Sequence, residues 1–135
     1  MAMTRTRIGL LPLYIELYDK IAPKARPRMD RFVEEIAAAL RRRGLDVVAA
    51  PTCRLKPEFA AAVRKIEKAG ADALVTLHLA YSPSLESSDV LAATRLPIIV
   101  LDTTPTFDYG PTQDPAELMY NHGIHGVQDM CNLLI

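Results

Sequence analysis

The stretch RPRMDRFVEEIAAALRRRGLDVVAAP, residues 26–51, joins a helix pattern directly to a strand pattern. Pro27 suits the first turn of a helix and Gly44 its C-terminal cap, so both ends of the helix are marked. Residues 46–51 then form a short apolar run that predicts a buried strand. The apolar residues that share one face of the helix are Met29, Phe32, Val33, Ile36, Ala37 and Leu40.

The same alternation continues on both sides of this stretch. Apolar runs predict strands at 8–13, 71–81 and 96–105, and helical spacing predicts helices at 56–70, at 84–95 and at the end of the chain. Aliphatic strands that alternate with helices are typical of a parallel sheet covered on both faces. We therefore expect one flavodoxin-like, doubly wound α/β domain over residues 1–135. The expected buried positions of the helix at 56–70 are Phe59, Ala62, Val63 and Ile66, and those of the last helix are Val127, Met130, Cys131 and Leu134.

Composition excludes several classes of function. Half of the 135 residues are hydrophobic, and 16 basic residues balance 16 acidic ones, so the formal net charge is zero. This balance gives no electrostatic reason to expect nucleic acid or an acidic membrane as a partner. No apolar run approaches the roughly 20 residues that a membrane span needs, so we expect a cytoplasmic protein. The two cysteines, Cys53 and Cys131, lack metal-ligand spacing and are expected to be buried free thiols.

The last helix ends in MCNLLI, residues 130–135, with neither a glycine cap nor a closing cation. An apolar end of this kind predicts either a fragment of a longer multidomain protein or a helix that docks against a neighbouring chain or domain.

Ligands of open parallel sheets bind beyond the carboxyl ends of the strands. The segments expected there, LPLYIELYD, HLAYSPS and DTTPTFDYGP, are rich in Tyr, Ser, Thr and Asp. Their hydroxyl groups suit a polyhydroxylated ligand, although any such fold also needs ordinary polar loops. The first loop has no glycine-rich phosphate motif, and Pro12 and bulky side chains keep its backbone from cradling phosphate. A receiver-type phospho-aspartate site lacks the acidic residues it would need behind the first strand.

The stretch NHGIHGVQD, residues 121–129, concentrates polar groups at the start of the last helix. His122 and His125 lie three residues apart, with Asp129 four residues further on, a spacing that is weak evidence for a metal site. In one interpretation the glycines at 123 and 126 let the helix N-terminus approach a ligand, with the imidazoles as hydrogen-bonding groups. In the other, the glycines serve only the helix entry, and the histidines satisfy local hydrogen bonds.

At these residues the chain resembles the N-terminal domain of the L-fucose/L-arabinose isomerase family. NHGIHGVQDMCN is similar to the family's helix-entry motif, LHLAYSPS to the loop after its third strand, and IGLLPLYIELYDKIAP to its first strand and loop. The resemblance covers nearly the whole chain in matching order. It implies a flavodoxin-like domain of an oligomeric, metal-dependent aldose–ketose isomerase in carbohydrate metabolism. It further implies that the divalent metal, usually manganese, is held by later domains, so this domain alone would be inactive.

The resemblance also implies site residues. His125 matches a histidine that contacts the sugar, whereas His122 stands where arabinose isomerases carry glutamine. His78 corresponds to the histidine of the third strand, and Ser82 to its loop. Gln128 and Asp129 depart from the basic–acidic pair of the arabinose isomerases, which leaves the sugar open. Tyr14 and Gly126 complete the expected substrate-binding set, in which His125 is the principal contact.

Two other classes of function remain open. The chain could be a stand-alone sugar-binding module, or an assembly module that forms oligomers through its apolar last helix.

Overall fold

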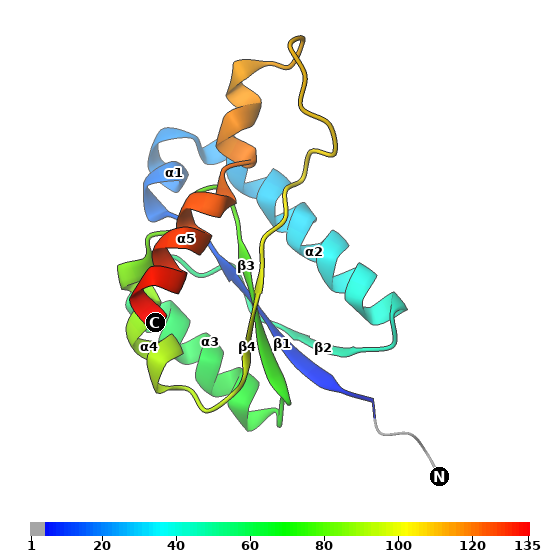
Figure 1. Cartoon of the computed structure of the whole chain (residues 1–135), viewed down its shortest axis with the longest axis vertical. Helices are drawn as coiled ribbons and strands as arrows, with labels where there is room; N and C mark the ends of the chain where they lie inside the picture. Colours follow the sequence, from blue (N-terminus) through cyan, green and yellow to red (C-terminus); the bar gives the residue numbers. More distant parts are fainter. Residues whose placement is uncertain (1–4) are drawn as a thin grey trace.

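The computed structural model describes residues 5–135 and contains one parallel sheet. All three strand pairs are parallel, and the strand order is β2-β1-β3-β4. This order and the helices around the sheet confirm the expected flavodoxin-like α/β fold (Figure 1). The strands are β1 (Arg7–Leu13), β2 (Asp46–Ala49), β3 (Ala73–His78) and β4 (Ile98–Leu101).

Helices cover both faces of the sheet, as the alternating pattern predicts. Helix α2 (Arg26–Arg42) packs on one face, and α3 (Lys56–Lys68), α4 (Ser88–Ala93) and α5 (Gly123–Leu134) pack on the other (Figure 1). The short elements α1 (Glu16–Ile21), η1 (Pro23–Ala25), η2 (Ser84–Glu86) and η3 (Pro115–Tyr120) complete the fold. None of the helices in residues 5–135 combines the length and the apolar character that crossing a bilayer requires.

Strand β1 divides the core into two halves because its side chains point alternately to the two faces. Ile8 and Leu10 belong to the cluster with α2, whereas Leu11 and Leu13 belong to the cluster with α3. Gly9 lies on the α3 side, where an added Cβ would meet the Ile66 side chain, with Cδ1 only 2.9 Å away. Glycine at this position therefore lets α3 lie close to the centre of the sheet.

The predicted helix faces are close to those observed. Every predicted buried position of α3 is buried, whereas two of the predicted positions of α2, Ile36 and Leu40, are only partly buried. On α5 only Met130 of the four is fully buried, because the helix lies at the margin of the core. Cys53 is buried as expected, but the prediction for Cys131 is wrong, since its thiol is only half-buried.

Several boundaries differ from the prediction. The expected helix at 84–95 is broken into η2 and α4 at Ser87, and it ends before Thr94, whose backbone is extended. The strands end earlier than the apolar runs, since residues 79–81 and 102–105 form loops. Pro12 lies within β1, where it has no N–H to donate, and the regular pairing with β2 stops at Leu10. Elements α1, η1 and η3 are additional to the expected ones.

Candidate functional site

An open pocket of about 430 Å³ lies beyond the carboxyl ends of β1 and β3. Chain order explains its place. From β1 the chain continues to β2 on one side, and after β2 it crosses to β3 on the other side of β1. Parallel sheets bind ligands at such a switch point. Tyr18 of α1 and both His122 and His125 at the start of α5 face this pocket. Its other wall comes from η3 and consists of Pro115, Ala116, Leu118 and Met119.

His122 is held in a defined orientation and tautomer. Its Nδ1 lies 2.7 Å from the carbonyl oxygen of Leu118, and because a carbonyl only accepts, Nδ1 carries the proton. Nε2 is then the acceptor for the Tyr18 hydroxyl, 3.2 Å away. The Tyr81 ring stacks nearly parallel to the imidazole, at an angle of 8° and a centroid distance of 6.4 Å. Each edge of His122 thus has a protein partner.

His125 differs from His122 in having a free ring. Its side chain is exposed at the pocket, and its ring nitrogens form no hydrogen bond with any residue in the range 5–135. The centroids of the two imidazoles are 6.0 Å apart, so one ligand of a few carbon atoms spans both. His125 is therefore the histidine that is ready to donate a hydrogen bond to a ligand or accept one from it.

Tyr18 closes the pocket from the side of α1. Its ring packs edge-on against Tyr14, with centroids 6.0 Å apart. Burial, with a smaller contribution from the neighbouring Tyr81, raises the pKa of the Tyr18 phenol. The hydroxyl therefore stays protonated over the physiological range and remains a donor.

The His78 side chain lies beneath the pocket rather than on its surface. It is 2% exposed, and its Nδ1 lies 2.9 Å from the hydroxyl of Ser82, which is equally buried. Burial lowers the pKa of His78 to about 4, so the imidazole is neutral at physiological pH. Among the described residues its Nε2 has no hydrogen-bond partner. His78 and Ser82 support the floor, and neither reaches the pocket lining.

Tyr14 is also enclosed. Its side chain is fully buried between β1 and α2, and burial raises the pKa of its phenol to about 12. The Arg26 guanidinium lies over its ring at 5.3 Å from the centroid. The hydroxyl has no hydrogen-bond partner among residues 5–135, and the structure does not bring it to the pocket.

The two glycines of the NHGIHG stretch face protein. A Cβ on Gly123 would lie 2.6 Å from the carbonyl oxygen of His78, and one on Gly126 would lie 2.9 Å from that of Ser82 and collide with its hydroxyl. Both glycines are buried, so they let α5 pack tightly on the loop after β3. Both Gly123 and Gly126 therefore agree with the second interpretation, in which the glycines serve the start of the helix and not a ligand. The free imidazole of His125 fits the ligand-binding interpretation.

No group of three His, Cys, Asp or Glu side chains within residues 5–135 has the arrangement to hold a metal ion. Asp129, which follows His125 at helical spacing, instead accepts a hydrogen bond from the Ser84 hydroxyl at 2.9 Å. The resemblance implies that the divalent metal is held by other domains, and residues 5–135 present no ligand set of their own for it.

A second pocket, of about 450 Å³, opens beside the loop between β2 and α3. Arg26 and Arg54 line it, but both are paired with carboxylates. Cys53 also lines it, and burial raises the pKa of this thiol to about 11, which keeps it protonated and poorly nucleophilic. The free imidazole is therefore what distinguishes the first pocket chemically.

Sequence reasoning missed the residues that α1 and η3 contribute. Tyr18 lies in the quoted loop LPLYIELYD, but its partner His122 is 104 positions away. A signal for η3 was present in Asp114 and Pro115: the Asp114 side chain accepts a hydrogen bond from the backbone N–H of Ala116, 2.9 Å away. This pairing of a capping residue with proline marks the start of a helix.

Comparison with known proteins adds no family assignment. No family model matches the chain, and no curated protein matches it in sequence.

Proposed function

We propose that this chain is the substrate-pocket and assembly domain of a metal-dependent aldose–ketose isomerase of the L-fucose/L-arabinose type. The observation that carries the proposal is the free imidazole of His125, which faces a pocket at the switch point of the sheet. The motif resemblance of residues 121–132 supports it, because it independently selects the same histidine. In this proposal the protein is an oligomeric enzyme, and a divalent metal, manganese in the family, is held outside this domain.

The chemistry of the pocket suits binding and orientation of a sugar. A sugar presents hydroxyl groups on one side and C–H groups on the other, and the lining offers His125 for the first and Leu118 and Met119 for the second. A volume of about 430 Å³ is within the usual range for small-molecule sites.

Interconversion of an aldose and a ketose moves a proton between two adjacent carbons through an enediol whose oxygens gain negative charge. In the proposal, His125 donates a hydrogen bond to a sugar hydroxyl or to this developing charge. His122 has its Nδ1–H on Leu118 and its Nε2 on Tyr18, so it fixes the wall beside the sugar. The proton transfer itself is assigned to groups of the enzyme outside this domain.

A second candidate function, a stand-alone sugar-binding module, is favoured by one observation: α1, η3 and α5 of the same chain together line the pocket that contains His125. The two proposals differ in what the isolated chain does. A module binds a pentose or hexose by itself, whereas the isomerase domain needs the rest of the enzyme for full affinity and for turnover.

Two measurements test these proposals. In the full-length enzyme, His125→Ala is expected to lower kcat/KM roughly 3- to 10-fold or more, because one hydrogen bond to the substrate is lost. Asn132→Ala, an exposed change on the same helix, is the matched control and is expected to leave kcat/KM unchanged. Metal content is expected to be the same in both variants.

Unchanged kinetics of His125→Ala would contradict the isomerase proposal for this pocket. Calorimetry of the isolated chain against a panel of pentoses and hexoses tests the module. Absence of heat with every sugar would contradict that second candidate.

A further inference from the structure

Helix α1 carries Tyr18 to the pocket, and Tyr18 is the one side chain of this helix that packs partly against the described hydrophobic core. None of its six residues is buried, and the side chains of Leu17 and Ile21 are 49% and 65% exposed. Its N-cap residue, Ile15, makes no side-chain capping bond. A helix of this length is unstable by itself, so contacts with other elements must fix its position.

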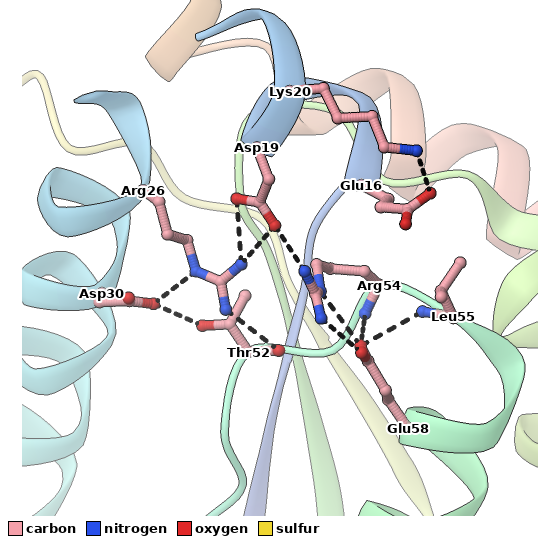
Figure 2. Close-up of polar contacts among 9 residues, drawn as sticks. All are labelled: Glu16, Asp19, Lys20, Arg26, Asp30, Thr52, Arg54, Leu55 and Glu58. Atoms are coloured by element: carbon pink, nitrogen blue, oxygen red, sulfur yellow. Dashed lines mark hydrogen bonds and ion pairs between the residues drawn. The ribbon is translucent and has the colours of Figure 1, made fainter. Parts of the chain in front are cut away.

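Asp19 supplies the contacts that tie α1 to the rest of the domain. Its carboxylate accepts hydrogen bonds from Arg26 at 3.1 and 3.3 Å and from Arg54 at 2.7 Å (Figure 2). Arg26 is the first residue of α2, and Arg54 lies in the loop before α3. One side chain thus joins α1 to both helical layers of the fold.

The two arginines are themselves held in place on their far sides. Arg26 also donates to Asp30 and to the carbonyl oxygen of Thr52, and Arg54 forms a forked pair with Glu58 (Figure 2). Hydrogen bonds from Arg54 lower the pKa of Glu58, so this carboxylate stays charged. Asp19 is therefore received by two preorganised guanidinium groups rather than by mobile surface chains.

Tyr18 is the neighbour of Asp19 in the chain, and its hydroxyl bonds to His122 Nε2 at 3.2 Å. The carboxylate and the phenol thus connect the same short helix to different parts of the fold: one to α2 and the β2–α3 loop, the other to the start of α5. A shift of α1 would break the bond between Tyr18 and His122.

We propose that Asp19 is a positioning residue of the pocket: its ion pairs with Arg26 and Arg54 hold α1 where the Tyr18 hydroxyl meets His122. The consequence for sugar binding rests on the proposed function, whereas the geometric statement does not depend on it. Neither arginine touches the pocket that contains His125, so Asp19 acts through Tyr18.

The first test uses Asp19→Asn, which removes the charge and keeps the shape. The matched control is Asp30→Asn, because Asp30 also pairs with Arg26 but has no contact with α1. The measurements are the nuclear Overhauser contact between the rings of Tyr18 and His122 and the titration of the Tyr18 phenol. In Asp19→Asn we expect the contact to be lost and the raised pKa of Tyr18 to return toward its ordinary value of 10.0 as the ring becomes solvated. Asp30→Asn is expected to preserve both properties.

Persistence of both properties in Asp19→Asn would overturn the inference, whatever the chain binds. If that variant does not give a folded spectrum, Arg54→Lys replaces it, because lysine keeps the charge but cannot reproduce the two-sided contact with Asp19 and Glu58. The same loss of the ring contact is expected there, and its retention would count equally against the inference.

The second test is a cycle of sugar affinities in the full-length enzyme. Asp19→Asn and Tyr18→Phe are each expected to weaken binding, roughly 3- to 10-fold for one hydrogen-bonded contact. Because Asp19 acts through Tyr18, the double variant is expected to be no weaker than the poorer single variant. Additive losses would refute action through Tyr18. If the wild-type enzyme binds no sugar, the proposed function fails, and the ring-contact measurement still decides the role of Asp19.

Discussion

Mild acidification is predicted to destabilise this fold through one buried side chain, His78. Burial lowers the pKa of its imidazole from 6.5 to about 4 in the folded chain. The unfolded chain titrates at the ordinary value, so below pH 6.5 it binds a proton that the folded chain excludes. The free energy of unfolding therefore falls with pH until the folded pKa is reached. At 1.36 kcal/mol per unit, the loss between about pH 7.5 and about pH 5 comes to roughly 2 kcal/mol.

The assay has two parts. Imidazole resonances of the three histidines are followed by NMR to obtain the pKa of His78 directly, and urea unfolding at several pH values gives the free energy. Carboxylates also begin to titrate near the acid end, so the direct titration is decisive. A His78 imidazole that titrates near 6.5 would refute the reasoning, because it would mean that the space between β3 and α5 admits water or a partner for Nε2.

Two further predictions concern the packing around the pocket. Gly126→Ala is expected to destabilise the fold by roughly 1–3 kcal/mol, because the new Cβ overlaps Ser82. The control is Gly110→Ala, where a Cβ meets nothing within 4 Å. Equal unfolding midpoints for the two variants would contradict the close packing at Gly126. The Glu117 carboxylate accepts hydrogen bonds from Arg28 at 2.7 and 2.5 Å, and these bonds lower the pKa of Glu117 from 4.5. The stability that this ion pair adds is therefore present above pH 4.5 and is lost as the pH falls through the pKa of Glu117 in the folded chain. Glu117→Gln is accordingly expected to lower the free energy of unfolding at neutral pH and to flatten its decline below pH 4.5, and an unchanged acid profile would count against this pair.

Much of the fold follows from local patterns. Helix α3 shows why: Phe59, Ala62, Val63 and Ile66 recur at helical spacing between a proline at one end and a glycine at the other, and all four are buried. All four side chains pack against the same sheet, and this requires apolar residues at helical spacing. The helix can therefore be predicted from its own residues, with no knowledge of which distant residues it contacts.

Elements held by distant partners carry no such pattern. Helix α1 has no buried residue, and its ion pairs reach partners 7 and 35 positions along the chain. Element η3 is tied to α2 by the pair of Glu117 with Arg28, 89 positions apart. Hydrophobic spacing predicts a face that packs, whereas these elements are fixed by individual charges whose partners become neighbours only after folding.

The same distinction applies to the candidate site. Sequence reasoning selected His122 and His125, and the structure brings both to one pocket. It could not separate them from His78, Tyr14 and Ser82, which the fold buries and which do not line that pocket. Exposure at the end of a strand depends on which helix covers it. Here α5 covers the loop after β3 because two glycines allow close approach.

NMR mapping of sugar binding on side-chain resonances shows directly whether His125 contacts the ligand. A pentose or hexose is titrated into the chain while the ring signals of His125, His122, Tyr18 and His78 are followed. We expect the signals of His125 to change most and those of its neighbours His122 and Tyr18 to change with them, while the signals of the buried His78 ring change least. Sugar-dependent changes that spare His125, or that cluster around Cys53 and the second pocket, would contradict this expectation.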